Sequence, residues 1–272
     1  MGAEVSMDEL KEFAKKEIQN GFKGKAIVAF IDLLGFRHEI LSKWDDGENH
    51  PLERLMKFKG FNEIAKQKAE FHDFQDYEGN TIAKIQYPEI ITFSDSFIFI
   101  QPLRDETPDD ILFSILSVCS TIFELWKVCI DGGFTIRGGL DFGEIYHNGR
   151  DLVGPSLIKA YELESNIANT SRIVASENIL TLIRSNLNEA NPITKEYYRR
   201  FMLNDVDQLI ILNPIVMYGY NNPEDIANSI KKLEEMMNNT SSFKLKAKYL
   251  NLIARLRNQI DPDNDFKIYN AY

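Results

Sequence analysis

Residues 26–36 read Ala-Ile-Val-Ala-Phe-Ile-Asp-Leu-Leu-Gly-Phe, a run of six apolar residues that ends on Asp32 and is followed by Gly35. The apolar run predicts a buried strand over residues 25–32, and the glycine permits a tight turn after it. An ionised carboxylate at the end of such a strand is costly unless it is paired with a cation or bound to a metal ion. Asp32 is therefore the first candidate for a functional residue.

A second apolar stretch carries a second aspartate in a similar position. Residues 90–99 read Ile-Ile-Thr-Phe-Ser-Asp-Ser-Phe-Ile-Phe. We expect extended chain over 81–87 and 89–94 and a strand over 96–101, which places Asp95 in a hairpin turn. Hard divalent cations prefer carboxylate oxygens, and two ions held by paired carboxylates can serve phosphoryl transfer. Taken singly, each aspartate has a simpler explanation, Asp32 as a helix cap and Asp95 as a turn residue.

Composition and charge restrict the class of protein. The 272 residues are 44% apolar and 26% charged, as in soluble globular proteins. A net charge of −10 disfavours a general nucleic-acid binder, whose affinity would rest on neutralising phosphates. Residues 1–16 lack an apolar signal region, and we expect no membrane span. Cys119 and Cys129 give no disulfide framework, so a reducing, cytoplasmic setting is the simplest interpretation.

The rest of the chain predicts alternating helices and strands. From hydrophobic spacing and turn residues we expect helices, a polar loop, a strand pair and single strands in this order: helix 6–20, helix 52–70, loop 73–80, helix 108–129, strand pair 134–140 and 143–146, helix 155–168, strand 172–175, helix 177–187 and strand 208–213. Two polar, amphipathic helices follow over 223–239 and 243–258, and a weakly ordered tail after residue 261. The expected division is an N-terminal helical segment (1–24), a catalytic domain (25–215) and a C-terminal helical extension (216–272).

Four segments together resemble the class III nucleotidyl cyclases, the catalytic domains of adenylate and guanylate cyclases. They are Phe-Ile-Asp-Leu-Leu-Gly-Phe at 30–36, Thr-Phe-Ser-Asp-Ser at 92–96, Thr-Ile-Arg-Gly-Gly-Leu-Asp-Phe-Gly-Glu-Ile at 135–145 and Gly-Pro-Ser-Leu-Ile-Lys-Ala-Tyr-Glu-Leu-Glu at 154–164. They occur in the order of that family and cover roughly residues 25–213. The resemblance implies an α+β, ferredoxin-like catalytic domain, here with a C-terminal helical extension.

The resemblance also implies a site that holds a nucleoside triphosphate and two Mg²⁺ or Mn²⁺ ions. Asp32 and Asp95 would bind the metals, with the main chain at Leu33 completing the shell, and Arg137 would contact the triphosphate. The turn that would cradle the phosphates consists of Leu33, Leu34, Gly35 and Phe36. Asp151 lies where the family often places a base-reading residue. Class III sites form between two protomers, so a homodimer with composite sites is implied.

Three positions depart from the purine cyclases. Ile91 stands where a Lys would read the base, and Ile158 and Glu162 replace an Asn and an Arg that stabilise transition-state charge. With the Ser-Asp-Ser segment and the Ala-Tyr-Glu-Leu-Glu helix, this pattern resembles the Pycsar pyrimidine cyclases of bacterial antiphage defence. That resemblance implies conversion of UTP or CTP, with UTP favoured, to a cyclic nucleotide that acts on a separate effector protein.

Several residues keep alternative interpretations. Arg137 has a possible acidic partner in Asp141, and Asp151 is equally explained as a surface-turn residue. Tyr87 and Tyr161 are candidates for stacking on a base or for the core. The cations Lys195, Arg199 and Arg200 precede the last strand and are typical of a solvated charge run. For the whole chain, the alternatives are a catalytically degenerate nucleotide-binding module, a purine cyclase, and a palm-type polymerase or dinucleotide cyclase.

Overall fold

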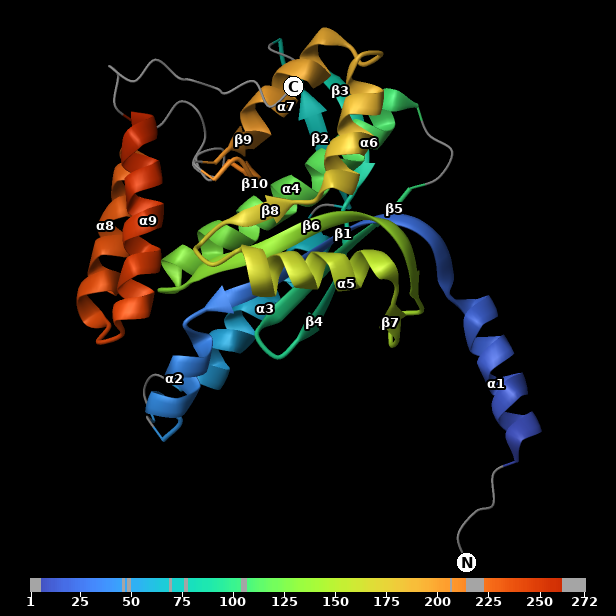
Figure 1. The fold of residues 1–272 in the computed structure, drawn as a ribbon, viewed down its shortest axis with the longest axis horizontal. Coiled ribbons are helices and arrows are strands. Elements are labelled where there is room, and N and C mark those ends of the chain that lie inside the picture. The colour runs from blue at the N-terminus through green and yellow to red at the C-terminus, as the bar shows by residue number, and fades with distance from the viewer. Residues whose placement is uncertain are drawn as a thin grey trace, which may run out of the picture.

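The computed structural model describes residues 6–45, 47, 50–68, 70–75, 78–103, 107–205, 207–213 and 223–260. Its centre is an eight-stranded sheet in the order β4-β5-β1-β6-β8-β10-β9, with β7 paired to β6 (Figure 1). The strands are β1 (Phe22–Leu34), β4 (Glu89–Phe93), β5 (Ser96–Pro102), β6 (Thr135–His147), β7 (Leu152–Val153), β8 (Ile173–Ala175), β9 (Met202–Asn204) and β10 (Ile210–Leu212). A separate hairpin pairs β2 (Phe71–Gln75) with β3 (Thr81–Gln86).

The connections give the sheet a ferredoxin-like core. Helices α2 (Phe36–Lys43) and α3 (Pro51–Lys68) lie between β1 and β4, and α4 (Pro108–Asp131) lies between β5 and β6. The chain thus runs β-α-β-β-α-β, and the four strands stand in the antiparallel order β4-β5-β1-β6. The predicted α+β, ferredoxin-like fold is confirmed by this topology.

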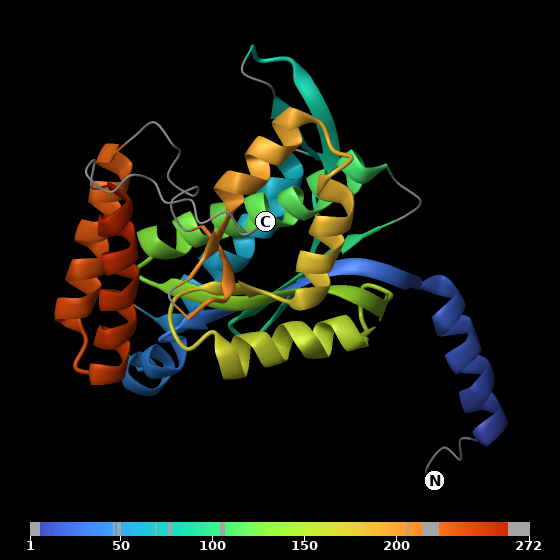
Figure 2. The same cartoon turned by 45° about the horizontal axis from the view of Figure 1, so that its top comes forward.

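Strand β1 is buried on both faces because helices cover the sheet on both sides. Ile27, Ala29 and Ile31 belong to the main core under α4, whereas Ala26 and Val28 pack in a second cluster. Helix α5 (Pro155–Glu162) and the π-helical turn η1 (Leu163–Ile167) lie on that second face, opposite α4 (Figure 2). Successive side chains of a strand point to opposite faces, so a strand that is covered on both faces has apolar residues at every position.

The expectation that no segment is long and apolar enough to cross a membrane was wrong for helix α4. By length and composition it qualifies, with a mean hydropathy of 1.7 over its most apolar window, but 72% of that window is buried inside the domain. It is the central core helix. Thr107 caps its N-terminus through its hydroxyl, which accepts from the Asp110 amide.

Several predicted boundaries were wrong. The expected strand pair over 134–140 and 143–146 is one strand, β6, which pairs with β1 without interruption from His147 to Thr135. Asp141 and Phe142, which separate the two expected strands, lie inside this ladder, because thirteen paired residues outweigh a weak local turn signal. The expected loop at 73–80 contains the end of β2, and α2, α7 (Pro192–Phe201) and β9 were not predicted.

The C-terminal helices form a pair, α8 (Pro223–Asn239) and α9 (Phe243–Ile260), close to their predicted ranges. Leu233, Leu252 and Leu256 are fully buried in the main core, so the pair is packed on the domain. It stands at the end of the sheet near α2, and α1 (Met7–Asn20) projects from the other side (Figure 1). The boundary expected at 215–216 and the tail after 261 lie outside the described residues.

Candidate active site at the end of the central strands

Asp32 lies near the end of β1 between two neighbouring strands. In the register of the sheet it stands opposite Ser96 of β5 on one side and opposite Arg137 of β6 on the other. Side chains directly opposite one another on antiparallel strands share a face and contact each other. The Asp32 carboxylate accordingly accepts from Nε and Nη2 of Arg137 at 3.4 and 3.3 Å.

Asp95 is brought to the same place by the hairpin between β4 and β5, as predicted. Ser94 takes up a left-handed backbone conformation there (φ 50°), which closes the two-residue turn. The Leu33 amide donates to the Asp95 carbonyl oxygen at 3.3 Å, and this bond ties the hairpin to the end of β1. The two aspartates therefore share one rim of the sheet.

The two carboxylates repel each other. Burial raises the pKa of Asp32 above its ordinary value, and the neighbouring charge of Asp95 raises it further, whereas Arg137 opposes both effects. A divalent cation between such oxygens would relieve this repulsion, so the donor set fits Mg²⁺ or Mn²⁺. The described part of the chain contains no cluster of three or more His, Cys, Asp or Glu side chains that could hold a metal ion.

Arg137 also contacts a second carboxylate. Its Nη2 lies 2.6 Å from Oε1 of Glu164, a residue of η1 whose side chain is only 4% exposed. Burial raises the pKa of Glu164 to about 7 even though the charge of Arg137 lowers it. The alternative partner Asp141 is elsewhere: it accepts from the Asn178 amide at 3.0 Å. Glu164, in the layer of helices that covers the sheet, thus holds the Arg137 side chain beside Asp32.

The turn after β1 leads directly into helix α2. Gly35 has a φ of 92°, a conformation that favours glycine, and it precedes the first helical residue, Phe36. The unpaired amides at a helix N-terminus attract anions. The turn is therefore suited to phosphate oxygens, as the resemblance implies for Leu33, Leu34, Gly35 and Phe36.

These groups border one cavity of about 750 Å³. Asp32, Asp95 and Arg137 line it from the sheet, and the turn after β1 lines it from the side. The remaining charged residues of its lining are Arg37 on α2 and Lys244 and Lys248 on α9. The sequence indicated the first group but not Lys244 and Lys248, because only packing brings α9 beside β1.

The structure does not bring Asp151 to this cavity. It lies in the exposed turn after β6, where its amide donates to the Asn148 side chain at 2.7 Å. That turn follows His147, at the other end of β6 from Arg137, roughly 30 Å away at about 3.3 Å per residue. Within one chain Asp151 cannot contact a nucleotide held by Asp32.

The other candidates also have partners of their own. Tyr87 stacks on His72 of β2 and donates to Glu124 of α4 at 2.6 Å, so its side chain packs between the β2–β3 hairpin and α4. Tyr161 is half exposed on α5 and packs edge-on against Phe30. Lys195 donates to the Asn188 carbonyl oxygen. The side chains of Arg199 and Arg200 lie outside the described part of the structure.

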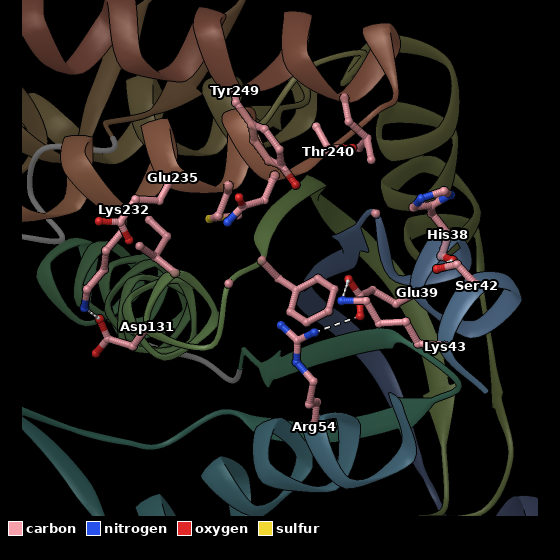
Figure 3. A pocket seen from close by; sticks show the side chains of 17 residues that line it. His38, Glu39, Ser42, Lys43, Arg54, Asp131, Lys232, Glu235, Thr240 and Tyr249 are labelled. Atoms are coloured by element: carbon pink, nitrogen blue, oxygen red, sulfur yellow. Dashed lines mark hydrogen bonds and ion pairs between the residues drawn. The ribbon is translucent and has the colours of Figure 1, made fainter. Parts of the chain in front are cut away.

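A second cavity, of about 410 Å³, lies behind the turn, between α2, α3 and the C-terminal helices (Figure 3). Its cationic side chains are already paired: Lys43 and Arg54 contact Glu39, and Lys232 contacts Asp131. Tyr249 of α9 points into it from one side and Arg54 from the other (Figure 3). This cavity lies beside the packed contact of the helical pair with the domain, and among the described residues it offers no pair of neighbouring free carboxylates for a metal ion.

Four residues at the candidate site were not predicted from the sequence: Glu164, Arg37, Lys244 and Lys248. Glu164 ends the segment over 154–164, and a carboxylate after an apolar helical face was the available signal. Lys244 and Lys248 are four residues apart on α9, which places them on one helix face. Nothing local distinguishes that face from an ordinary solvated one.

No protein-family model matches this sequence, and no curated protein matches it either. Among solved structures, the chain is similar to the monomeric guanylyl cyclase domain of the RhoGC fusion protein from the aquatic fungus Blastocladiella emersonii, with 18% identity over 70% of this chain and 95% of that one, at a TM-score of 0.45. It is similar to the guanylate cyclase domain of RhGC from Catenaria anguillulae in complex with GTP, with 16% identity over 60% of this chain and 84% of that one, at a TM-score of 0.40. A class III adenylyl cyclase-like ATP-binding protein from Pseudomonas aeruginosa is 11% identical over 72% of this chain and 48% of that one, at a TM-score of 0.41.

Proposed function

We propose that this chain is a nucleotidyl cyclase that converts UTP or CTP, with UTP favoured, to the 3′,5′-cyclic monophosphate and pyrophosphate. The observation that carries the proposal is the meeting of Asp32, Asp95 and Arg137 at one cavity. Two carboxylates and a guanidinium beside a glycine turn form a site for a metal-bound triphosphate. The order of the four sequence segments supports the cyclase chemistry in particular.

The reaction joins the ribose 3′-oxygen to the α-phosphorus, breaks the bond from that phosphorus to the pyrophosphate oxygen, and releases the 3′ proton. Asp32, Asp95 and the Leu33 carbonyl would hold two Mg²⁺ or Mn²⁺ ions. Such ions, when bound, lower the pKa of the attacking hydroxyl and neutralise charge on the leaving phosphates.

The chain's own groups position the triphosphate. Arg137 is held in place by Glu164 and can share its remaining N–H groups with phosphate oxygens. Amides of the turn beyond Leu33 add donors at the start of α2, whereas the Leu33 amide is already bonded to the Asp95 carbonyl oxygen. Positioning and charge stabilisation are the main contributions a protein makes to phosphoryl transfer.

The pyrimidine preference rests on the departures from the purine pattern. Ile91 has no hydrogen-bonding side chain for a base edge, and the nearby polar residues are engaged elsewhere: Glu89 contacts His147, and Lys84 lies over the ring of Phe71. If Asp151 reads the base, it does so from a second copy of the chain, since it lies too far from Asp32 in its own. The proposal therefore includes a homodimer with composite sites.

The biological part of the proposal follows the Pycsar resemblance. The product would be a second messenger in bacterial antiphage defence, made in the cytoplasm and read by a separate effector protein. Neither nucleic acid nor a membrane is required as a partner. The net charge of −10 supports the first point.

A degenerate nucleotide-binding module is the second candidate, and one observation favours it. Ile158 is 57% exposed on α5, and among the described residues Glu162 is engaged only with Lys159, at 3.9 Å. The helix thus presents an apolar and an acidic side chain where the purine cyclases use an Asn and an Arg. Retention of both aspartates supports the enzyme.

Incubation of the purified protein with ATP, GTP, CTP and UTP in Mn²⁺, followed by mass identification of products, tests the proposal. We expect cyclic UMP or cyclic CMP from the wild type, none from Asp32→Ala or Asp95→Ala, and wild-type amounts from Asp8→Ala, which changes an exposed aspartate of α1. No product from any nucleotide would favour the binding module. A cyclic purine nucleotide as the main product would remove the pyrimidine assignment, and linked dinucleotides would remove the mononucleotide cyclase.

A further inference from the structure

Helix α9 lies against the glycine turn at the centre of the candidate site. A Cβ atom at Gly35 would lie 3.6 Å from Leu245 and 3.7 Å from the Tyr249 hydroxyl, which is ordinary van der Waals contact. Tyr249 and its neighbours Leu252 and Ile253 are buried in the main core. The C-terminal extension is therefore part of the wall of the site, packed directly on the turn after β1.

This packing turns two lysines of α9 toward the aspartates. Lys244 and Lys248 are separated by one helical turn and line the same cavity as Asp32, Asp95 and Arg137. Lys246, between them, points elsewhere because successive helical residues are rotated by about 100°. It lines neither this cavity nor the one in Figure 3.

Lys248 has no partner among the described residues. It is half-buried, forms no hydrogen bond or close ion pair there, and lies within electrostatic range of Arg137, Lys244, Asp32 and Glu164. The two carboxylates within that range are already engaged, since Asp32 and Glu164 both contact Arg137. A half-buried ammonium group without a partner is costly, and an anion in the cavity would compensate it.

The balance of charge in the cavity points to an anion with several charges. Four cationic side chains line it, and Arg137 is paired with Asp32 and Glu164. The other three, Arg37, Lys244 and Lys248, form no ion pair among the described residues, and Asp95 is the remaining carboxylate of the lining. The cavity in Figure 3 differs, because its lysines and arginine are paired with carboxylates of its own wall. Of these two cavities, the first has cations to spare for a ligand.

We infer that α9 completes the active site and that Lys248 binds the terminal phosphates of the polyphosphate chain, with the exposed Lys244 assisting at the rim. The inference rests on the proposed function, because it takes the ligand of the aspartate pair to be a nucleoside triphosphate. Lysine suits this task as a mobile point charge with three donors. The C-terminal extension is then a source of phosphate-binding charge within the same chain.

Calorimetric titration of the full chain with inorganic tripolyphosphate in the presence of Mg²⁺ tests this inference without requiring turnover. We expect Lys248→Gln to weaken binding about tenfold or more, as for loss of one charge-assisted hydrogen bond. Lys244→Gln should weaken it about two- to threefold, because that side chain is exposed. Lys248→Arg should keep most of the affinity, and Lys246→Gln is the matched control that should bind like the wild type.

Equal binding by the wild type and Lys248→Gln would overturn the inference, as would no binding of tripolyphosphate by the wild type or an equal loss in Lys246→Gln. If Lys248→Gln does not fold, acetylation of the wild type with and without tripolyphosphate decides: protection of Lys248 but not of Lys246 supports the inference, and equal labelling overturns it. If the wild type forms no cyclic nucleotide but binds tripolyphosphate through Lys248, the proposed reaction is wrong and the role of Lys248 stands. If Lys248→Gln forms cyclic nucleotide as fast as the wild type, the role of α9 is wrong and the proposed reaction stands.

Discussion

Asp32 and Arg137 stand directly opposite each other on β1 and β6, and their side chains form an ion pair with Oδ2 and Nη2 3.3 Å apart. The same Nη2 lies 2.6 Å from Glu164, which belongs to the layer of helices over the sheet. The guanidinium is thus held between a sheet carboxylate and a helix carboxylate. The fold itself orients Arg137, so its position depends on the packing of η1 as much as on the strand register.

Replacement of Arg137 by Ala should destabilise the protein. It leaves the buried carboxylate of Glu164 and that of Asp32 without their cation, and removal of one partner of a buried ion pair is strongly destabilising. Because the Arg137 side chain is 22% exposed, we expect a loss of about 2–3 kcal/mol in the free energy of unfolding, measured by urea denaturation. The control is Arg184→Ala, which breaks an exposed pair with Glu177 and should change stability by about 0.5 kcal/mol or less. Similar losses in the two variants would contradict this account of Arg137.

Replacement of Asp95 by Asn should separate metal binding from folding. It removes a charged ligand, so we expect the affinity for Mn²⁺ to fall by at least about tenfold. The thermal midpoint should stay the same or rise, because the repulsion that raises the pKa of Asp32 is relieved and the Leu33–Asp95 main-chain bond is kept. Electron paramagnetic resonance of free Mn²⁺ measures the affinity, and Asp8→Asn serves as the control. Unchanged Mn²⁺ affinity in Asp95→Asn would show that this carboxylate is no ligand.

The local parts of this site could be predicted from sequence. The strand that ends at Asp32, the turn at Asp95 and the two C-terminal helices each have a signal within a few residues: an apolar run, a polar break in such a run, or a helical period. Pairing over long distances leaves no such signal. For this reason the sequence predicts two strands, over 134–140 and 143–146, where the structure has the continuous ladder between β6 and β1.

The same reason explains which site residues were not predicted. Glu164 reaches Arg137 only because α5 and η1 fold back over β6, and Lys248 reaches the cavity only because α9 docks on Gly35. Both contacts join segments far apart in the chain. Asp151 shows the opposite case, since its place in a sequence motif suggested the site but the length of β6 removes it from the cavity of its own chain.

Ser94 should tolerate glycine better than a β-branched residue. Its φ of 50° is unfavourable for residues with a Cβ atom, most of all for branched ones. We expect Ser94→Gly to change the free energy of unfolding by about 0.5 kcal/mol or less, because relief of strain offsets the greater freedom of the unfolded chain. Ser94→Val should lose about 1–2 kcal/mol. Chemical denaturation of both variants checks this, and equal stability of the two would show that the turn relaxes.

His72 should make stability depend on pH in the mildly acidic range. Burial lowers the pKa of its imidazole from 6.5 to about 4, and the ring stacks on Tyr87 and contacts the Thr121 hydroxyl. Between these values the unfolded chain binds a proton that the folded chain does not. The stabilisation is therefore complete above pH 6.5 and is lost as the pH falls toward 4.

The lowered pKa of His72 corresponds to a loss on the order of 3 kcal/mol in the free energy of unfolding between pH 6.5 and 4. His72→Gln keeps a polar side chain near Thr121 and cannot take up the proton, so its stability should fall less over this range. The difference between the two pH profiles isolates the histidine from carboxylates that titrate in both proteins. Parallel profiles of the wild type and the variant would contradict a buried, neutral His72.

Gly139 fixes how closely α5 approaches the sheet. A Cβ atom there would lie 2.2 Å from the Ala160 carbonyl oxygen and 2.5 Å from Cβ of Leu163, so Gly139→Ala must push α5 and η1 away. We expect a loss of about 2–3 kcal/mol in the free energy of unfolding, measured in urea. Gly60→Ala is the matched control, because no atom lies within 4 Å of a Cβ built there and alanine favours helix α3, so that variant should gain about 0.5–1 kcal/mol.

Since η1 carries Glu164, Gly139→Ala should also weaken the contact between Glu164 and Arg137. Addition of Arg137→Ala should then cost less stability in Gly139→Ala than it does in the wild type. Additive losses in the double variant would show that helix position and guanidinium position are independent.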